Sequence, residues 1–109
     1  MIQIIFHVDE MEKWHLALEN ARNALNAQSD ATVEMLANAA AVNFFASDYE
    51  RPEIYQELID RGVKFAACRN ALRNNEVAED SVPAEVKIVG AGVIELAEKQ
   101  NAGYAYIRP

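Results

Sequence analysis

The chain alternates between short apolar runs and longer segments in which apolar residues recur every three or four positions. The short runs are rich in β-branched residues and predict strands, whereas the longer segments have the period of amphipathic helices. The expected strands cover residues 2–8, 32–37, 63–67, 86–89 and 104–107, and the expected helices cover 10–27, 52–61, 70–75 and 93–101. Residues 38–45 are expected to form a short helical or loop element, and the polar residues 76–83 a loop.

The first expected helix shows its pattern most clearly. One stripe of apolar side chains runs along it at spacings of three and four, formed by Met11, Trp14, Leu18, Ala21 and Leu25. The polar residues Glu12, Lys13, Glu19 and Asn23 lie elsewhere on the helix. We therefore expect Trp14 in the core or in an interface rather than at a ligand.

Strands that alternate with helices predict an α/β fold, with a parallel sheet covered by helices on both faces. A chain of 109 residues is long enough for one such domain, spanning residues 1–109, and too short for a second core. Ligands of these sheets bind beyond the carboxyl ends of the strands. His7, Asp9, Asn38, Cys68 and the turn 90–92 all lie at the carboxyl ends of expected strands, so we expect them at one rim.

Cys68 is the only cysteine, and it lies between the end of a predicted strand and the start of a predicted helix. At such a position the unpaired N–H groups of the helix, together with Arg69, favour the thiolate over the thiol. Four of the ten basic residues fall within residues 61–75, which contain no Asp or Glu. This stretch indicates an anionic ligand or a stabilised thiolate. The alternatives are a small buried hydrophobic side chain at Cys68 and basic residues that solvate an exposed face.

The remaining composition limits the classes of function. A net charge of −7 and a pI near 4.7 argue against nucleic acid as the main partner. One cysteine cannot form an internal disulfide, which fits a reducing compartment. The apolar runs are far shorter than the ~20 residues of a membrane span, and the first residues lack signal-peptide features. We therefore expect a cytoplasmic protein without a membrane partner.

Other candidate chemistry is weaker. Gly90 and Gly92 lie between a strand and a helix, but Glu95 occupies the place of the third glycine of a dinucleotide fingerprint. We expect a tight turn there that lets the backbone approach a ligand or a neighbouring subunit, with a nucleotide or flavin as a less favoured reading. His7 is a candidate base or proton donor for Cys68, or a structural histidine. Two histidines and one cysteine give no metal-ligand spacing, so neither a metal nor another cofactor is expected.

Five segments together resemble a known family. They are residues 6–14, 37–42, 63–72, 91–100 and 103–109, of which the Cys68 segment and the C-terminal segment are the specific ones. With them the chain resembles the DsrE/DsrF-like proteins, in particular the small stand-alone group named for intracellular sulfur oxidation. One departure is Asn38 followed by three alanines, Ala39 to Ala41, where relatives often have glycine and an acidic residue.

The resemblance implies a three-layer α/β/α sandwich with a five-stranded, mainly parallel sheet, assembled as a homotrimer or hexamer. It also implies a sulfur relay, in which the cysteine matching Cys68 carries sulfur as a persulfide between donor and acceptor proteins. We expect Arg69 and the amides of Asn70 and Ala71 to hold the terminal sulfur or another small anionic ligand, with Asn38 and His7 as second contacts. The alternative is a non-catalytic oligomeric module that binds a small ligand or protein. In that alternative Cys68 is merely packed, and exposed aromatic residues, Trp14, Tyr104 and Tyr106, form subunit contacts.

Overall fold

A five-stranded sheet forms the centre of the computed structural model, which describes all residues 1–109. The strands are β1 (Gln3–Val8), β2 (Thr32–Ala37), β3 (Lys64–Cys68), β4 (Val86–Val89) and β5 (Ala105–Ile107). Their order in the sheet is β4-β3-β2-β1-β5, and every neighbouring pair is parallel. The chain therefore steps outward from β1 to β4 and then crosses back to add β5 on the free side of β1.

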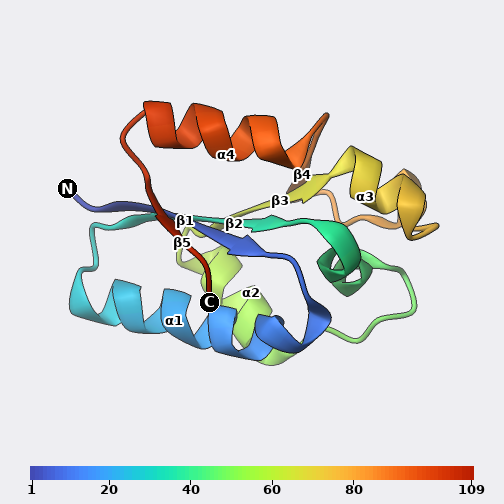
Figure 1. Cartoon of the computed structure of the whole chain (residues 1–109). Helices are drawn as coiled ribbons and strands as arrows, with labels where there is room; N and C mark the ends of the chain where they lie inside the picture. Colours follow the sequence, from blue (N-terminus) through green and yellow to red (C-terminus); the bar gives the residue numbers. More distant parts are fainter.

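Helices cover both faces of this sheet. Figure 1 shows α1 (Trp14–Ala27) and α2 (Glu53–Asp60) beneath it, α4 (Gly92–Asn101) above it, and α3 (Arg69–Asn74) beyond the end of β3. Three short 3-10 turns complete the chain: η1 (Met11–Lys13), η2 (Ala39–Phe45) and η3 (Glu79–Ser81). The α/β prediction with its three layers is confirmed. None of the helices combines the length and the apolar character needed to cross a membrane.

The two faces of the sheet are packed very differently. The face covered by α1 and α2 carries most of the core. It includes an aromatic cluster in which Trp14 stacks on Phe44, with 4.2 Å between the ring centroids. The indole Nε1 of Trp14 donates a hydrogen bond to the carbonyl of Ala41 at 3.0 Å. Trp14 is 2% exposed, so its predicted core position is confirmed and its expected role as an exposed subunit contact is wrong.

The layer on the opposite face is thinner, because a single helix of ten residues, α4, covers that face. Its apolar cluster contains five buried residues, Ile5, Leu36, Ala66, Val89 and Leu96. Strand alternation places the side chains of Glu34, Leu36 and Asn38 on this same face. The thin layer leaves polar groups close to the sheet on this face.

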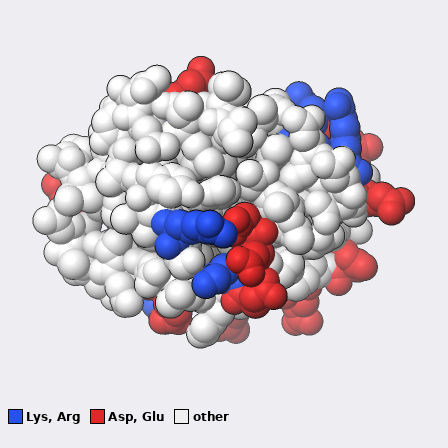
Figure 2. Space-filling model, viewed as in Figure 1, with Lys and Arg blue, Asp and Glu red and all other residues white.

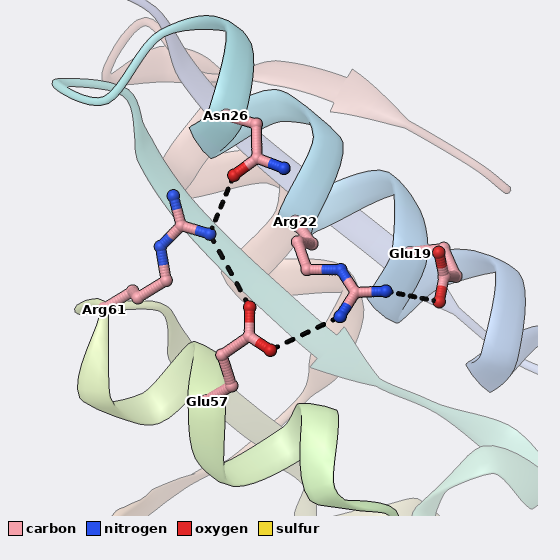
Figure 3. A network of polar contacts seen from close by, with 5 residues as sticks. All are labelled: Glu19, Arg22, Asn26, Glu57 and Arg61. Carbon is pink, nitrogen blue, oxygen red and sulfur yellow. Dashed lines mark hydrogen bonds and ion pairs between the residues drawn. The ribbon is translucent and has the colours of Figure 1, made fainter.

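An ionic network joins α1 to α2 (Figure 3). Arg22 of α1 reaches Glu19 at 2.9 Å and Glu57 of α2 at 3.3 Å. Arg61, just after α2, returns to Glu57 at 3.7 Å and donates to Asn26 at 3.0 Å. These side chains are about one-third exposed, so each pair contributes at most about 1 kcal/mol. Their main effect is to set how the two helices lie against each other.

Candidate functional site

The carboxyl ends of β2 and β3 bring two predicted site residues together. Asn38 directly follows β2, Cys68 ends β3, and the two strands are neighbours in the sheet. The N-terminus of α4 closes over them from the adjacent layer, with Gly92 in contact with both. The expected gathering of Asn38, Cys68 and the glycine turn at one rim is therefore what the structure shows.

These residues line a cavity of about 530 Å³. Three elements form its walls: the start of η2, one side of α3, and the first turn of α4. Its polar side chains are Cys68 and four carboxamides, those of Asn38, Asn70, Asn74 and Asn75, and the remaining lining residues are alanines, Gly92 and Val93. No charged residue lines the cavity. Its recognition chemistry is therefore that of neutral hydrogen-bonding groups around one thiol.

Cys68 stands at the N-cap of α3 with an extended backbone, φ −73° and ψ 121°, and it is 5% exposed. No side chain caps the first turn of α3, so the N–H groups of Asn70 and Ala71 have no capping partner. Both residues line the same cavity as Cys68. The sulfur is thus largely sheltered from solvent and shares its cavity with two residues from the first turn of α3.

The two glycines of the turn after β4, Gly90 and Gly92, differ in how closely other residues approach them. A Cβ atom on Gly92 would lie 3.3 Å from Cβ of Cys68 and 3.3 Å from Cγ of Asn38. A side chain there would push apart the residues that line the cavity. A Cβ on Gly90 would meet nothing within 4 Å. The close approach expected for this turn therefore belongs to Gly92, where α4 meets β2 and β3.

A chain of hydrogen bonds holds the Asn38 side chain. Its Oδ1 accepts from the backbone N–H of Ala39 at 2.9 Å, which leaves Nδ2 to donate to Nε2 of His7 at 3.5 Å. Nδ1 of His7 lies 2.7 Å from the hydroxyl of Tyr106 on β5. Burial lowers the pKa of His7, Asp9 opposes this shift, and Arg108 adds to it. The neutral imidazole that results accepts at Nε2 and donates at Nδ1, which fits both contacts.

His7 itself does not line the cavity. Its only hydrogen-bonded neighbour there is Asn38, which stands between the imidazole and the space beside Cys68. His7, predicted as a second contact to the ligand, is therefore connected to the cavity only through Asn38. The structure shows no hydrogen bond from His7 to the thiol.

The basic residues that are near Cys68 in the sequence do not line its cavity. Nε of Arg69 pairs with Glu79 of η3 at 2.9 Å, and Arg69 is absent from the cavity wall. Lys64 begins β3 whereas Cys68 ends it, so the two lie at opposite ends of the strand. Figure 2 shows the basic side chains at the α3 end of the molecule with acidic ones beside them. The positive stretch of the sequence does not form a positive lining at the sulfur.

Two features of the cavity wall carry little signal in the sequence. Ala39 has a φ of +48°, in the left-handed region that favours glycine. Asn75 ties α3 to η2: it accepts from Asn43 at 3.1 Å and donates to the carbonyls of Ala39 and Ala71. The alanine run drew attention to this segment, but nothing in the sequence predicted its left-handed backbone or singled out Asn75.

Comparisons with known proteins agree with this architecture. The model of the DsrE/DsrF-like family matches residues 2–109. A protein of unknown function from Methanobacterium thermoautotrophicum, MTH1491, is 32% identical over the full length of both chains, with a TM-score of 0.90. The ychN protein from E. coli shares the fold over the full length of both chains, with a TM-score of 0.83 at 14% identity. No curated protein sequence matches the chain. The family match over almost every residue is decisive: the chain belongs to the DsrE/DsrF-like family.

Proposed function

We propose that the protein is a sulfur carrier in which Cys68 holds one sulfur atom as a persulfide and passes it to a partner. The Cys68 thiolate attacks the outer sulfur of a donor persulfide, R–S–SH. The S–S bond of the donor breaks, a new S–S bond forms on Cys68, and the donor leaves as its thiolate, R–S⁻, which takes up a proton from solvent. In the second step an acceptor thiolate attacks the outer sulfur on Cys68 and regenerates the Cys68 thiolate. Neither step needs an external oxidant or reductant.

One observation carries this proposal: the only thiol of the chain lines a cavity of about 530 Å³ at the carboxyl end of a parallel sheet. A cysteine that merely filled the core would not line so large a space. The cavity is far larger than one sulfur atom requires, which leaves room for the thiol-bearing end of a donor or acceptor. Membership of the DsrE/DsrF-like family also supports this role, because the resemblance implies a sulfur-carrying cysteine at the position of Cys68.

The surroundings of the thiol suit a sulfur anion whose charge is spread over a large atom. The free first-turn N–H groups of α3 and the Nδ2 group of Asn38 are neutral donors at the cavity wall. Donors of this kind stabilise a developing anion without a fixed counter-ion. We assign this role to Asn38 and to the amides of Asn70 and Ala71. Arg69, which is paired with Glu79, contributes only its distant charge.

The experiment that tests the relay is a single-turnover transfer. The reduced protein is loaded with a low-molecular-mass persulfide, freed of excess donor by desalting, and mixed with a thiol acceptor. We expect one equivalent of sulfur on the acceptor for each loaded chain, and none from the Cys68→Ser variant treated in parallel. Equal transfer by Cys68→Ser and the parent would contradict the proposal. A free thiol in the resting carrier fits a reducing compartment, so we place this reaction in the cytoplasm.

The burial of Cys68, which is 5% exposed, favours the second candidate function, a non-catalytic module that binds a ligand or a protein. In that case the cavity would bind its ligand equally well without the sulfur. A Cys68→Ala variant that keeps full function in a cell would support this second candidate. A variant that folds normally but loses function would support the relay.

A further inference from the structure

A second cavity, of about 140 Å³, lies between α4 and the sheet, away from the Cys68 site. Two buried glutamates line it, Glu34 from the middle of β2 and Glu95 from the first turn of α4. They are 6% and 5% exposed and are the only buried charged residues in the chain. Two carboxyl groups are therefore held together in a poorly solvated space.

One ion pair is formed by these two carboxyl groups, and it belongs to Glu34. Nζ of Lys99, on α4, lies 3.3 Å from Oε1 of Glu34 and also sits over the ring of Tyr104. Oε2 of Glu34 is buried and has no hydrogen-bond partner. The other charged residues at this cavity are Lys64 on β3, which is paired in register with Glu34, Lys87 on β4, and Glu85 just before β4. Neither Lys64 nor Lys87 forms an ion pair with Glu34 or Glu95. Two buried carboxylates with one close ammonium leave a negative charge uncompensated, which is costly in a poorly solvated space.

A proton removes this imbalance. A protonated carboxyl group has an O–H donor, so one glutamate can donate to the other and satisfy the orphaned oxygen. We propose that Glu34 and Glu95 share one proton in the folded protein, that the shared proton fastens α4 to β2, and that its loss loosens the first turn of α4 where it closes the Cys68 cavity.

We call this proton-sharing pair, Glu34 and Glu95, the latch. Its electrostatics and its position both support the proposal. Burial, followed by the hydrogen bond and the charge of Glu95, raises the pKa of Glu34 from 4.5 to about 7, although Lys99 opposes the shift. The proton is thus exchanged close to neutral pH. Glu95 follows Gly92 by three residues, and its backbone N–H donates to the carbonyl of Ala91, so the latch acts on the same turn that contacts Cys68 and Asn38.

The latch does not depend on the sulfur chemistry, because both its evidence and its test lie in the carboxyl groups and the backbone of α4. The test uses the full chain labelled for carboxyl ¹³C NMR and titrated from acidic to alkaline pH. The carboxyl signal of Glu34 is expected to titrate near neutrality. If Glu34 is fully ionised in acid, at the pH where exposed glutamates ionise, the proposal is overturned.

Amide exchange of α4 in the same samples tests the mechanical part. As pH rises above the near-neutral step, the protection factors of the first turn of α4 are expected to fall by up to tenfold per pH unit, since one proton is linked to the opening. Glu34→Gln keeps an N–H donor for Glu95, and we expect it to make this protection independent of pH. Glu98→Gln, an exposed site on the same helix, is the matched control and should behave like the parent. Protection that stays constant with pH in the parent would refute the latch.

Discussion

Ala39 offers the sharpest test of the backbone that shapes the Cys68 cavity. Its φ of +48° lies in the left-handed region, although alanine carries a side chain. The left-handed conformation costs an ordinary residue roughly 1–2 kcal/mol. Glycine escapes this cost but makes the unfolded chain more flexible, which offsets about 0.4–1 kcal/mol. Ala39→Gly is therefore expected to raise the free energy of unfolding by about 0.5–1 kcal/mol.

Ala40 provides a matched control, because it is the next residue of the same turn and its φ is not positive. A glycine there gains no relief and is expected to lower the free energy of unfolding by about 0.5–1 kcal/mol. Urea unfolding of the parent and both variants measures the two changes, with an unchanged slope showing that the unfolded state is comparable. The two substitutions should have opposite signs. If both destabilise the protein by the same amount, the left-handed conformation of Ala39 and the reasoning from it are wrong.

Four further predictions follow from the same structure. Gly92→Ala places a methyl group 3.3 Å from Cβ of Cys68 and should slow alkylation of the thiol severalfold, whereas Gly90→Ala, which points into open space, should leave the rate unchanged. Arg69→Ala should alter the alkylation rate less than twofold, because the guanidinium is paired with Glu79. A tenfold lower rate would show that Arg69 does act on the thiol. The pKa of Glu34 is raised from 4.5 to about 7, so the folded protein binds this proton more tightly than the unfolded chain. Stability should therefore fall as pH rises from about 4.5 through about 7, by no more than about 3 kcal/mol, and Glu34→Gln should flatten this slope in pH-dependent urea unfolding. Sedimentation should give the mass of a homotrimer or hexamer, and a monomer at micromolar concentration would contradict that prediction.

The sequence predicted the elements well because their hydrophobic periods are unambiguous. Every expected strand and helix is present, and the second and fourth strands have the predicted bounds. The rim could also be predicted, since in a parallel sheet residues that follow different strands share one edge. Strand order could not, because it depends on how the crossovers pack. That order decided that Asn38 is the neighbour of Cys68 and that His7 is one strand further away.

Side-chain direction explains the remaining differences. The sequence placed Arg69 beside the sulfur, but the residue starts a helical turn and its long side chain finds Glu79 outside the cavity. The carboxyl pair was also missed, because Glu34 and Glu95 are far apart in the chain and meet only when α4 packs on β2. A glutamate in the middle of an otherwise largely apolar strand was the signal that pointed to it.

The most direct test of the central claim, that Cys68 carries sulfur, is the intact mass of the reduced protein after incubation with a sulfane-sulfur donor. The account predicts a gain of one sulfur atom that a reducing agent reverses and that the Cys68→Ala variant does not show. If the folded parent protein gains no sulfur, Cys68 is a structural thiol and the relay is contradicted.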